Sequence, residues 1–248
     1  MKYTQKEIDE MIKIYRKSLK TDWTKLEDEQ TPRGMKLPKP SVYKSYDSGD
    51  ILDLNKDVNN LSSRNLDDII MSRRSLRKYQ DVELTLEEIS YLMKLTCHIR
   101  RIGDGFALGV IPTGGARSSL ETYIYLRKAK NIKPGLYHYM KDTGNLRLIK
   151  DDLSDKMLND SLKGQLRDCA AIVFWSAVPY RMEYKYSFTS HKMIAIEAGH
   201  ACQNLYLACE AIDFGMVAIC AYDQTKVDNM FEFGEEEFVV YCATLGKK

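Results

Sequence analysis

Apolar residues at helical spacing mark four stretches of the chain. Residues 4–19 begin with a capping-box pattern, Thr4 with Glu7, and a second such pattern, Thr85 with Glu88, opens another apolar stripe. We predict helices over residues 4–19 and from residue 85 onward, a short helix near residues 66–70 and a long helix over 192–212. The long helix is apolar around almost its whole circumference, which predicts burial on all sides and is typical of a subunit interface.

Strand patterns alternate with these helices. Two segments joined by a turn at residues 141–144 predict a hairpin, and the run 170–175 is apolar on both faces, which predicts a central strand covered on each side. The predicted strands are residues 121–126, 135–139, 145–149, 170–175, 216–221 and 238–245, with a short helix near 227–231. Because there is no regular βαβ alternation, we expect an α+β fold with a mixed central sheet flanked by helices.

Proline, glycine and serine change the pattern in the first quarter of the chain. They gather at residues 31–48, which we expect to run extended over the surface. We therefore predict an N-terminal extension over residues 1–60 and a compact domain over residues 61–248. Two further segments are expected to be loops: the glycine-punctuated stretch before residue 121, which holds Gly103, Gly105 and Gly109, and residues 179–187.

Composition narrows the functional classes. The 248 residues carry a formal net charge of +2, so no summed field favours nucleic acid or a membrane surface as partner. The six cysteines form no C-x-x-C pair and are expected to be reduced thiols, as in a cytoplasmic protein. The longest apolar run, residues 170–178, is about half as long as a bilayer span requires, and no apolar core of signal-peptide length follows the first residues.

Two segments carry groups suited to an anionic ligand. Arg73, Arg74 and Arg77 lie within five residues beside Ser75, and guanidinium groups match phosphate oxygens, although a solvated basic turn would show the same pattern. The second segment has two glycines whose backbone can approach a ligand closely, or form an ordinary turn before a strand. It comprises Pro112, Thr113, Gly114, Gly115, Ala116 and Arg117.

Polar residues on the long helix and in the segment after the central strand are further candidates. Glu197, His200 and Asn204 share one helix face, where a buried polar network is favoured over a metal site because no second ligand pair exists. Lys185 precedes Tyr186, and a lysine beside a phenol can make a general base in a desolvated site. The spacing of Gly103, Gly105 and Gly109 does not fit a dinucleotide-binding fingerprint.

Taken in order, these segments resemble the nitroreductase-like flavoprotein superfamily, and within it the SagB/ThcOx type of FMN-dependent dehydrogenase. The similarity runs from about residue 65 to the end. The residues that carry it are Arg73 to Arg77, Pro112 to Arg117, Gly135 to Tyr139, Lys185 with Tyr186, Glu197 to His200, Gln203 to Leu205, and Leu245 with Gly246. Thr113 stands where the family usually has serine, and Cys220 stands where it commonly has glycine.

The resemblance implies an intertwined homodimer with FMN bound between the chains. Arg73, Arg74, Ser75 and Arg77 would hold the flavin, Pro112 to Gly115 would approach it from the partner subunit, and Cys220 and Ala221 would face its N5 atom. Gly246, Lys247 and Lys248 would lie near the phosphate. By the same resemblance Lys185 and Tyr186 are catalytic, the reaction oxidises an azoline to an azole in a peptide or small substrate, and a cyclodehydratase-type protein is a candidate partner.

Two other functions stay open from the sequence. One is an NAD(P)H-dependent reductase of nitro compounds, quinones or dehydroamino acids. The other is a catalytically idle flavoprotein that acts as a scaffold in a modification complex, against which the Lys185–Tyr186 pair argues.

Overall fold

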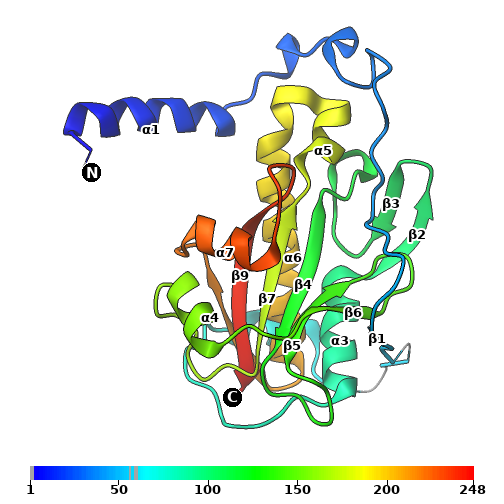
Figure 1. Cartoon of the computed structure of the whole chain (residues 1–248), viewed down its shortest axis with the longest axis vertical. Coiled ribbons are helices and arrows are strands. Elements are labelled where there is room, and N and C mark those ends of the chain that lie inside the picture. Colours follow the sequence, from blue (N-terminus) through cyan, green and yellow to red (C-terminus); the bar gives the residue numbers. More distant parts are fainter. Residues whose placement is uncertain (1–2, 56, 59–60) are drawn as a thin grey trace.

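A seven-stranded sheet forms the centre of the computed structural model, which describes residues 3–55, 57–58 and 61–248. Its strand order is β1-β6-β5-β4-β7-β9-β8, and all neighbours pair antiparallel (Figure 1). The strands are β1 (Ile51–Leu52), β4 (Leu120–Leu126), β5 (Gly135–Tyr139), β6 (Leu146–Lys150), β7 (Ala171–Ala177), β8 (Phe214–Ile219) and β9 (Phe238–Lys247). The α+β class is confirmed, but the pairing is antiparallel where a mixed sheet was expected.

Strict alternation along the central strands builds two apolar layers. In β4, Ile124 belongs to one core cluster and its neighbour Tyr123 to the other, and in β7 Trp175 and Phe174 divide in the same way. β7 is buried along its whole length, as its continuous apolar run predicts.

Helices cover both faces of the sheet. α3 (Leu86–Cys97) and α6 (Ser190–Ala211) pack on one face, and α4 (Asp155–Ser161) with α7 (Gln224–Phe231) pack on the other. The capping box of Thr85 and Glu88 forms at the start of α3, as predicted. No helix among the described residues is long and apolar enough to cross a membrane.

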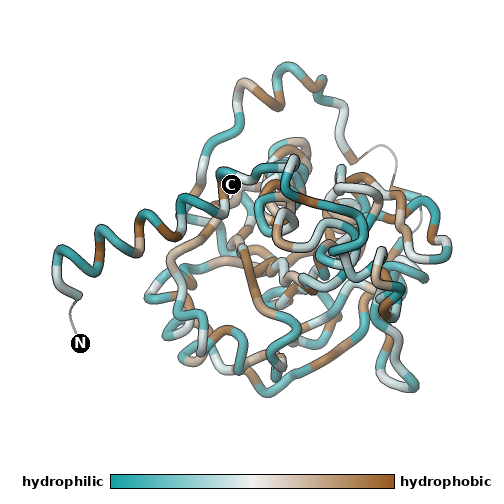
Figure 2. Tube along the Cα trace, turned by 90° about the horizontal axis from the view of Figure 1, so that it is seen from above, coloured by the Kyte–Doolittle hydropathy of each residue, from teal (hydrophilic) through white to brown (hydrophobic). Residues whose placement is uncertain are grey.

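The N-terminal segment leaves the body of the protein and returns to it. α1 (Gln5–Leu19) begins with the predicted capping box, has no buried residue and projects away from the rest (Figures 1 and 2). The chain then passes two short 3-10 turns, η1 (Trp23–Lys25) and η2 (Asp28–Gln30), and runs beside α5 toward β1. The predicted boundary between residues 60 and 61 has Asn60 on one side, which lies outside the described residues.

Two segments that the sequence predicted as loops are regular. Residues 99–109 form a separate hairpin of β2 (Ile99–Gly103) and β3 (Phe106–Gly109), with Gly105 at φ +75° in its turn. Residues 179–186 form α5 (Pro179–Tyr186), with proline in the first turn, where its missing N–H costs nothing. α2 (Leu66–Ser72) occupies the position predicted for a short helix.

The long helix α6 differs from its prediction because one side of it is not covered. Ile196 is 48 % exposed, and a side chain added at Gly199 would meet no atom within 4 Å. The exposed positions Ala195, Ile196, Gly199 and Gln203 form one stripe at helical spacing. The prediction of burial on all sides is therefore wrong for a single chain.

Candidate active site

The segment from Arg73 to Arg77, here called the arginine segment, lies along the outer edge of β8. The Leu76 backbone N–H donates to the Met216 carbonyl at 2.9 Å. This close approach needs Gly215, because a Cβ atom there would lie 2.3 Å from Leu76 Cδ2. The pairing holds the backbone in place while the arginine side chains reach the surface.

Charge and hydrogen-bond donors gather on the arginine segment. The Arg73 guanidinium lies over the Tyr206 ring, 4.9 Å from its centroid, and Ser75 Oγ lies 3.0 Å from Tyr206 Oη. Arg74 donates to the backbone carbonyls of Met71 and Arg73. Among the described residues, Arg73, Arg74 and Arg77 form no ion pair with a carboxylate, so their donors fit a phosphate group.

The other candidate residues near this edge, Gly246, Lys247 and Lys248, already have partners in the fold. Lys248 Nζ lies 2.6 Å from Glu210 Oε1, and Lys247 Nζ lies 3.6 Å from Glu88 Oε1. Gly246 pairs with Gly215 across β9 and β8 and packs against the Tyr79 side chain. Cys220 and Ala221 follow β8 and are exposed, in the continuation of the strand beside which the arginine segment lies.

The second candidate segment, residues 112–117, is called the glycine loop. Thr113 Oγ1 and Ser119 Oγ both donate to Glu197 Oε2, at 2.7 and 2.9 Å. His200 Nδ1 lies 3.2 Å from the Pro112 carbonyl, and Asn204 donates to the Val110 carbonyl at 3.3 Å. Glu197 thus bonds the loop from a buried position, while the exposed His200 and the half-buried Asn204 contact the backbone at its start and just before it.

Lys185 and Tyr186, at the end of α5, converge on Gly115 of the glycine loop. Gly115 has φ +55°, and a Cβ atom there would lie 2.3 Å from Tyr186 Oη and 2.9 Å from Lys185 Nζ. Glycine is thus required both by the backbone conformation and by the contact. Lys185 Nζ also lies 5.3 Å from the Tyr186 ring centroid, so both side chains reach one place although they are adjacent in sequence.

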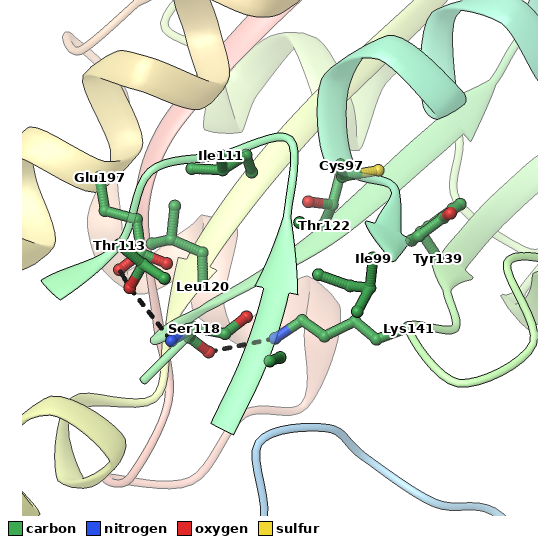
Figure 3. A pocket seen from close by; sticks show the side chains of 12 residues that line it. Cys97, Ile99, Ile111, Thr113, Ser118, Leu120, Thr122, Tyr139, Lys141 and Glu197 are labelled. Atoms are coloured by element: carbon green, nitrogen blue, oxygen red, sulfur yellow. Dashed lines mark hydrogen bonds between the residues drawn. The ribbon is translucent and has the colours of Figure 1, made fainter. Parts of the chain in front are cut away.

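A small, mostly apolar pocket with polar groups at both ends lies beside the glycine loop (Figure 3). Glu197 and Thr113 line one end and Lys141 the other, with Ser118 between them. Burial raises the pKa of Glu197, and burial lowers the pKa of Lys141 to about 8. Lys141 Nζ donates to the Ser118 carbonyl at 3.1 Å, which joins this lysine to the loop.

A buried ion cluster, which the sequence analysis missed, lies beside this pocket. Glu121, with a fully buried side chain, lies 2.6 Å from Arg181 Nη1, 3.0 Å from His138 Nε2 and 3.5 Å from Lys141 Nζ. Burial alone would raise its pKa, but the charges of Lys141 and Arg181 hold the pKa of Glu121 well below its usual range. A glutamate inside the apolar strand 120–126 was the signal that could have revealed it.

The arginine segment and the glycine loop contact α6 at different positions along its axis. Tyr206 contacts the arginine segment, whereas Glu197, His200 and Asn204 hold the glycine loop. Glu197 and Tyr206 are nine residues apart, which is about 13 Å along a helix axis. The structure thus brings Lys185 and Tyr186 to the glycine loop, and it places the arginine segment, Cys220 and Ala221 in a second group.

Residues 70–247 match the sequence model of the nitroreductase family. The chain belongs to this family. A provisionally named nitroreductase of Methanocaldococcus jannaschii is 25 % identical over 185 residues, which are 74 % of this chain and 91 % of the relative. The family assignment makes the chain a nitroreductase-family oxidoreductase, and it confirms the broader part of the resemblance stated from the sequence.

Solved structures share the nitroreductase fold. A provisionally named nitroreductase of Ralstonia eutropha superimposes with a TM-score of 0.66 at 20 % identity, over 83 % of this chain and 92 % of that one. A chain of the Escherichia coli microcin synthetase McbBCD complex, with truncated pro-MccB17 bound, gives 0.63 at 16 % identity, over 99 % and 95 %. For a similar Anabaena variabilis chain the score is 0.62 at 24 % identity, over 73 % of this chain but only 38 % of the longer relative.

Nitroreductase-family proteins commonly bind FMN, and the residues of this chain fit such a ligand. The guanidinium groups of the arginine segment, which form no ion pair among the described residues, are with the Ser75 hydroxyl a donor set for a phosphate. The missing side chain at Gly115 lets Tyr186 Oη and Lys185 Nζ pack against the loop backbone. The donor set of the arginine segment suits a phosphorylated ligand.

Proposed function

We propose that this nitroreductase-family protein is an FMN-dependent dehydrogenase of the SagB type. Its substrate would be an azoline ring in a peptide or a related small molecule, which is oxidised to an azole. The observation that carries the proposal is the convergence of Lys185 Nζ and Tyr186 Oη on the backbone of Gly115. An acid–base pair at a glycine-lined surface is what removal of a carbon-bound proton requires.

Each of the two catalytic side chains would have one role. Tyr186 would take the proton from the ring Cα at its phenolate oxygen, and the Lys185 ammonium would stabilise that phenolate by its positive charge. Bound FMN would supply the two-electron acceptor for the hydride that leaves Cβ. The glycine loop would present the backbone of Gly114 and Gly115 at the same place, with Thr113 fixed from behind by Glu197.

The arginine segment would hold the flavin phosphate. Arg74 and Arg77 have exposed side chains, and Arg73 is oriented by the face of Tyr206. Lys247 and Lys248 would contribute only after leaving Glu88 and Glu210. The exposed backbone at Cys220 and Ala221 would face the ring at N5.

A homodimer is part of the proposal, because one chain carries the two groups of residues at separate places. The uncovered stripe of α6 offers an apolar surface for a second copy, with Ile196 at its centre and room at Gly199. The arginine segment of one copy and the glycine loop of the other would then share one flavin.

The same proposal extends to partners and organisation. The likeness to a chain of the McbBCD synthetase over almost the whole length supports a cyclodehydratase-type partner for the peptide substrate. The six cysteines are unpaired and five are buried, which supports a cytoplasmic location. We further propose residues 1–60 as an extension to a catalytic domain of residues 61–248.

A reduction reaction is the second candidate. The M. jannaschii relative is provisionally named a nitroreductase, which favours an NAD(P)H-dependent reductase of nitro compounds, quinones or dehydroamino acids. Rapid anaerobic bleaching of the flavin by NADH or NADPH would support this alternative. Reduction by an azoline substrate without either nucleotide would support the dehydrogenase.

The test of the proposal is turnover by the FMN-reconstituted protein. A peptide carrying an azoline should lose two hydrogens, measured by mass spectrometry, and both Lys185→Ala and Tyr186→Phe should reduce the rate at least about a hundredfold. The exposed lysine of α4 gives a control, Lys156→Ala, which should match the wild type. Normal rates for both site variants at equal FMN occupancy would remove the pair from the mechanism.

A further inference from the structure

The N-terminal segment is fastened along the helix that carries Lys185 and Tyr186. The Arg33 backbone N–H donates to the Tyr184 carbonyl at 2.9 Å, in the last turn of α5, where helix carbonyls lack a partner within the helix. Tyr180 Oη donates to the Pro38 carbonyl at 3.0 Å, and Arg181 Nε donates to the Ser41 carbonyl at 2.7 Å. These bonds follow α5 from one end to the other, so the segment has a fixed course beside it.

This course brings Trp23 against Tyr186. The two ring centroids are 5.7 Å apart with an interplanar angle of 84°, an edge-to-face arrangement. Trp23 lies on η1, which is capped by Asp22 through bonds from the Thr24 backbone N–H at 3.1 Å and the Thr24 hydroxyl at 2.7 Å. The local turn therefore fixes the backbone that carries the indole.

The position of Trp23 is not explained by the core. Its residue is 49 % exposed, whereas the other tryptophan, Trp175, is completely buried. An edge-to-face pair leaves at least one face of each ring uncovered by the other ring. A half-exposed indole beside the candidate base therefore presents apolar ring surface at the candidate site.

We propose that Trp23 and Tyr186 form a binding subsite for a planar ring of the substrate, with Trp23 as its specificity-determining residue. The inference rests on the proposed role of Lys185 and Tyr186, and it adds a residue from outside the stretch that matches the family, residues 70–247. A flat five-membered heterocycle stacks on such surfaces, and a puckered saturated ring makes poorer contact. The N-terminal segment thus supplies one wall of the site and contributes to the choice of substrate.

Binding of two small probes to the FMN-reconstituted protein tests this subsite. Thiazole-4-carboxamide is planar and thiazolidine-4-carboxamide is saturated, and calorimetry should show that the wild type prefers the planar probe. Trp23→Ala should weaken binding of the planar probe about tenfold and abolish the preference, and Trp23→Phe should retain most of it. The exposed aromatic Tyr15 of α1 gives a matched control, Tyr15→Ala, which should behave as the wild type.

A second measurement follows Trp23 itself. The chain has two tryptophans, and Trp175 Nε1 is buried with no hydrogen-bond partner in the part of the chain that the structure describes. Trp175→Phe therefore removes an unsatisfied donor and leaves Trp23 as the single indole. The planar probe should protect Trp23 fluorescence from acrylamide in this variant. A purely structural anchor would give no such protection.

The subsite and the proposed reaction fail in different ways. If Trp23→Ala binds the planar probe as tightly as the wild type, or if the wild type shows no preference between the probes, the subsite is refuted even if azolines are oxidised. If the preference depends on Trp23 but Lys185→Ala and Tyr186→Phe turn over normally, the subsite stands and the proposed roles of those residues fall.

Discussion

Replacing Glu121 by glutamine tests the energetic weight of the buried ion cluster beside the candidate site. The substitution keeps the shape of the side chain but removes the negative charge among three basic groups, at 2.6 Å from Arg181, 3.0 Å from His138 and 3.5 Å from Lys141. Arg181 and Lys141 are both buried, so their positive charges would remain without compensation. Breaking a buried pair in this way costs about 3–5 kcal/mol.

The expected loss is a large fraction of the total stability. A folded chain is typically stable by about 5–15 kcal/mol. For a slope of about 3 kcal/mol per molar urea, the midpoint should fall by at least about 1 M with the slope unchanged. Circular dichroism during urea unfolding measures both quantities.

A surface carboxylate provides the control for this measurement. Glu232 pairs with Lys150 at 2.6 Å, but its side chain is 76 % exposed, so Glu232→Gln should cost at most about 1 kcal/mol. Adding Lys141→Met to Glu121→Gln should cost less than the sum of the two single changes, because it removes one uncompensated charge. A midpoint for Glu121→Gln equal to that of the control would refute the assignment of a compensated buried cluster.

Three further changes have defined outcomes. Gly115→Ala should lower the thermal midpoint and reduce turnover, because φ is +55° and the new Cβ would meet Tyr186 Oη; about 1–3 kcal/mol is expected, and an unchanged midpoint would contradict the geometry. Removal of residues 1–20 should leave the midpoint unchanged in calorimetry, since no residue of α1 is buried; a clear drop would mean that α1 is packed in solution. Above about pH 9 the protein should lose stability in urea titrations, because burial raises the pKa of Cys169 and Cys202 to about 12 and the unfolded chain releases those protons first. Stability from the thiols is complete below pH 9 and declines as pH rises, and Cys169→Ala should reduce that decline.

Local chemistry predicted much of this fold. The capping boxes at Thr4 and Thr85 form as expected, because they involve residues only three positions apart. The apolar run of β7 predicted that this strand lies at the centre of the sheet. A strand that is buried on both faces has apolar residues at nearly every position, so the signal is local as well. Features that depend on only a few neighbouring residues could therefore be predicted.

Features that depend on distant neighbours could not. The glycines of the β2–β3 hairpin suggested a loop. In the fold Gly109 allows a close backbone approach, because a Cβ atom there would lie 2.7 Å from the His98 carbonyl oxygen. α5 was predicted as a loop, and two of its residues, Tyr180 and Arg181, are bonded by the N-terminal segment some 140 positions earlier. The meeting of Trp23 with Tyr186 likewise needs the whole course of that segment.

The candidate site also combines features that the local sequence predicted with features that depend on distant residues. The sequence singled out Lys185, Tyr186 and the glycine loop by resemblance, and the fold supplies the reason for their proximity, the contact at Gly115. The ion cluster at Glu121 was missed because its partners lie far along the chain, on β5, in the turn after β5 and on α5. A charged residue within an apolar strand is the only local sign of such a cluster.

The pairing of Leu76 with Met216 has a consequence for the association of folded chains. β8 is the last strand of the sheet, and an open strand edge is a template on which another chain can add. The backbone of residues 75 and 76 occupies part of that edge, and three neighbouring guanidiniums repel any second copy that approaches in register. The arginine segment would thus reduce the addition of further chains at this edge for as long as no anionic ligand neutralises its charge.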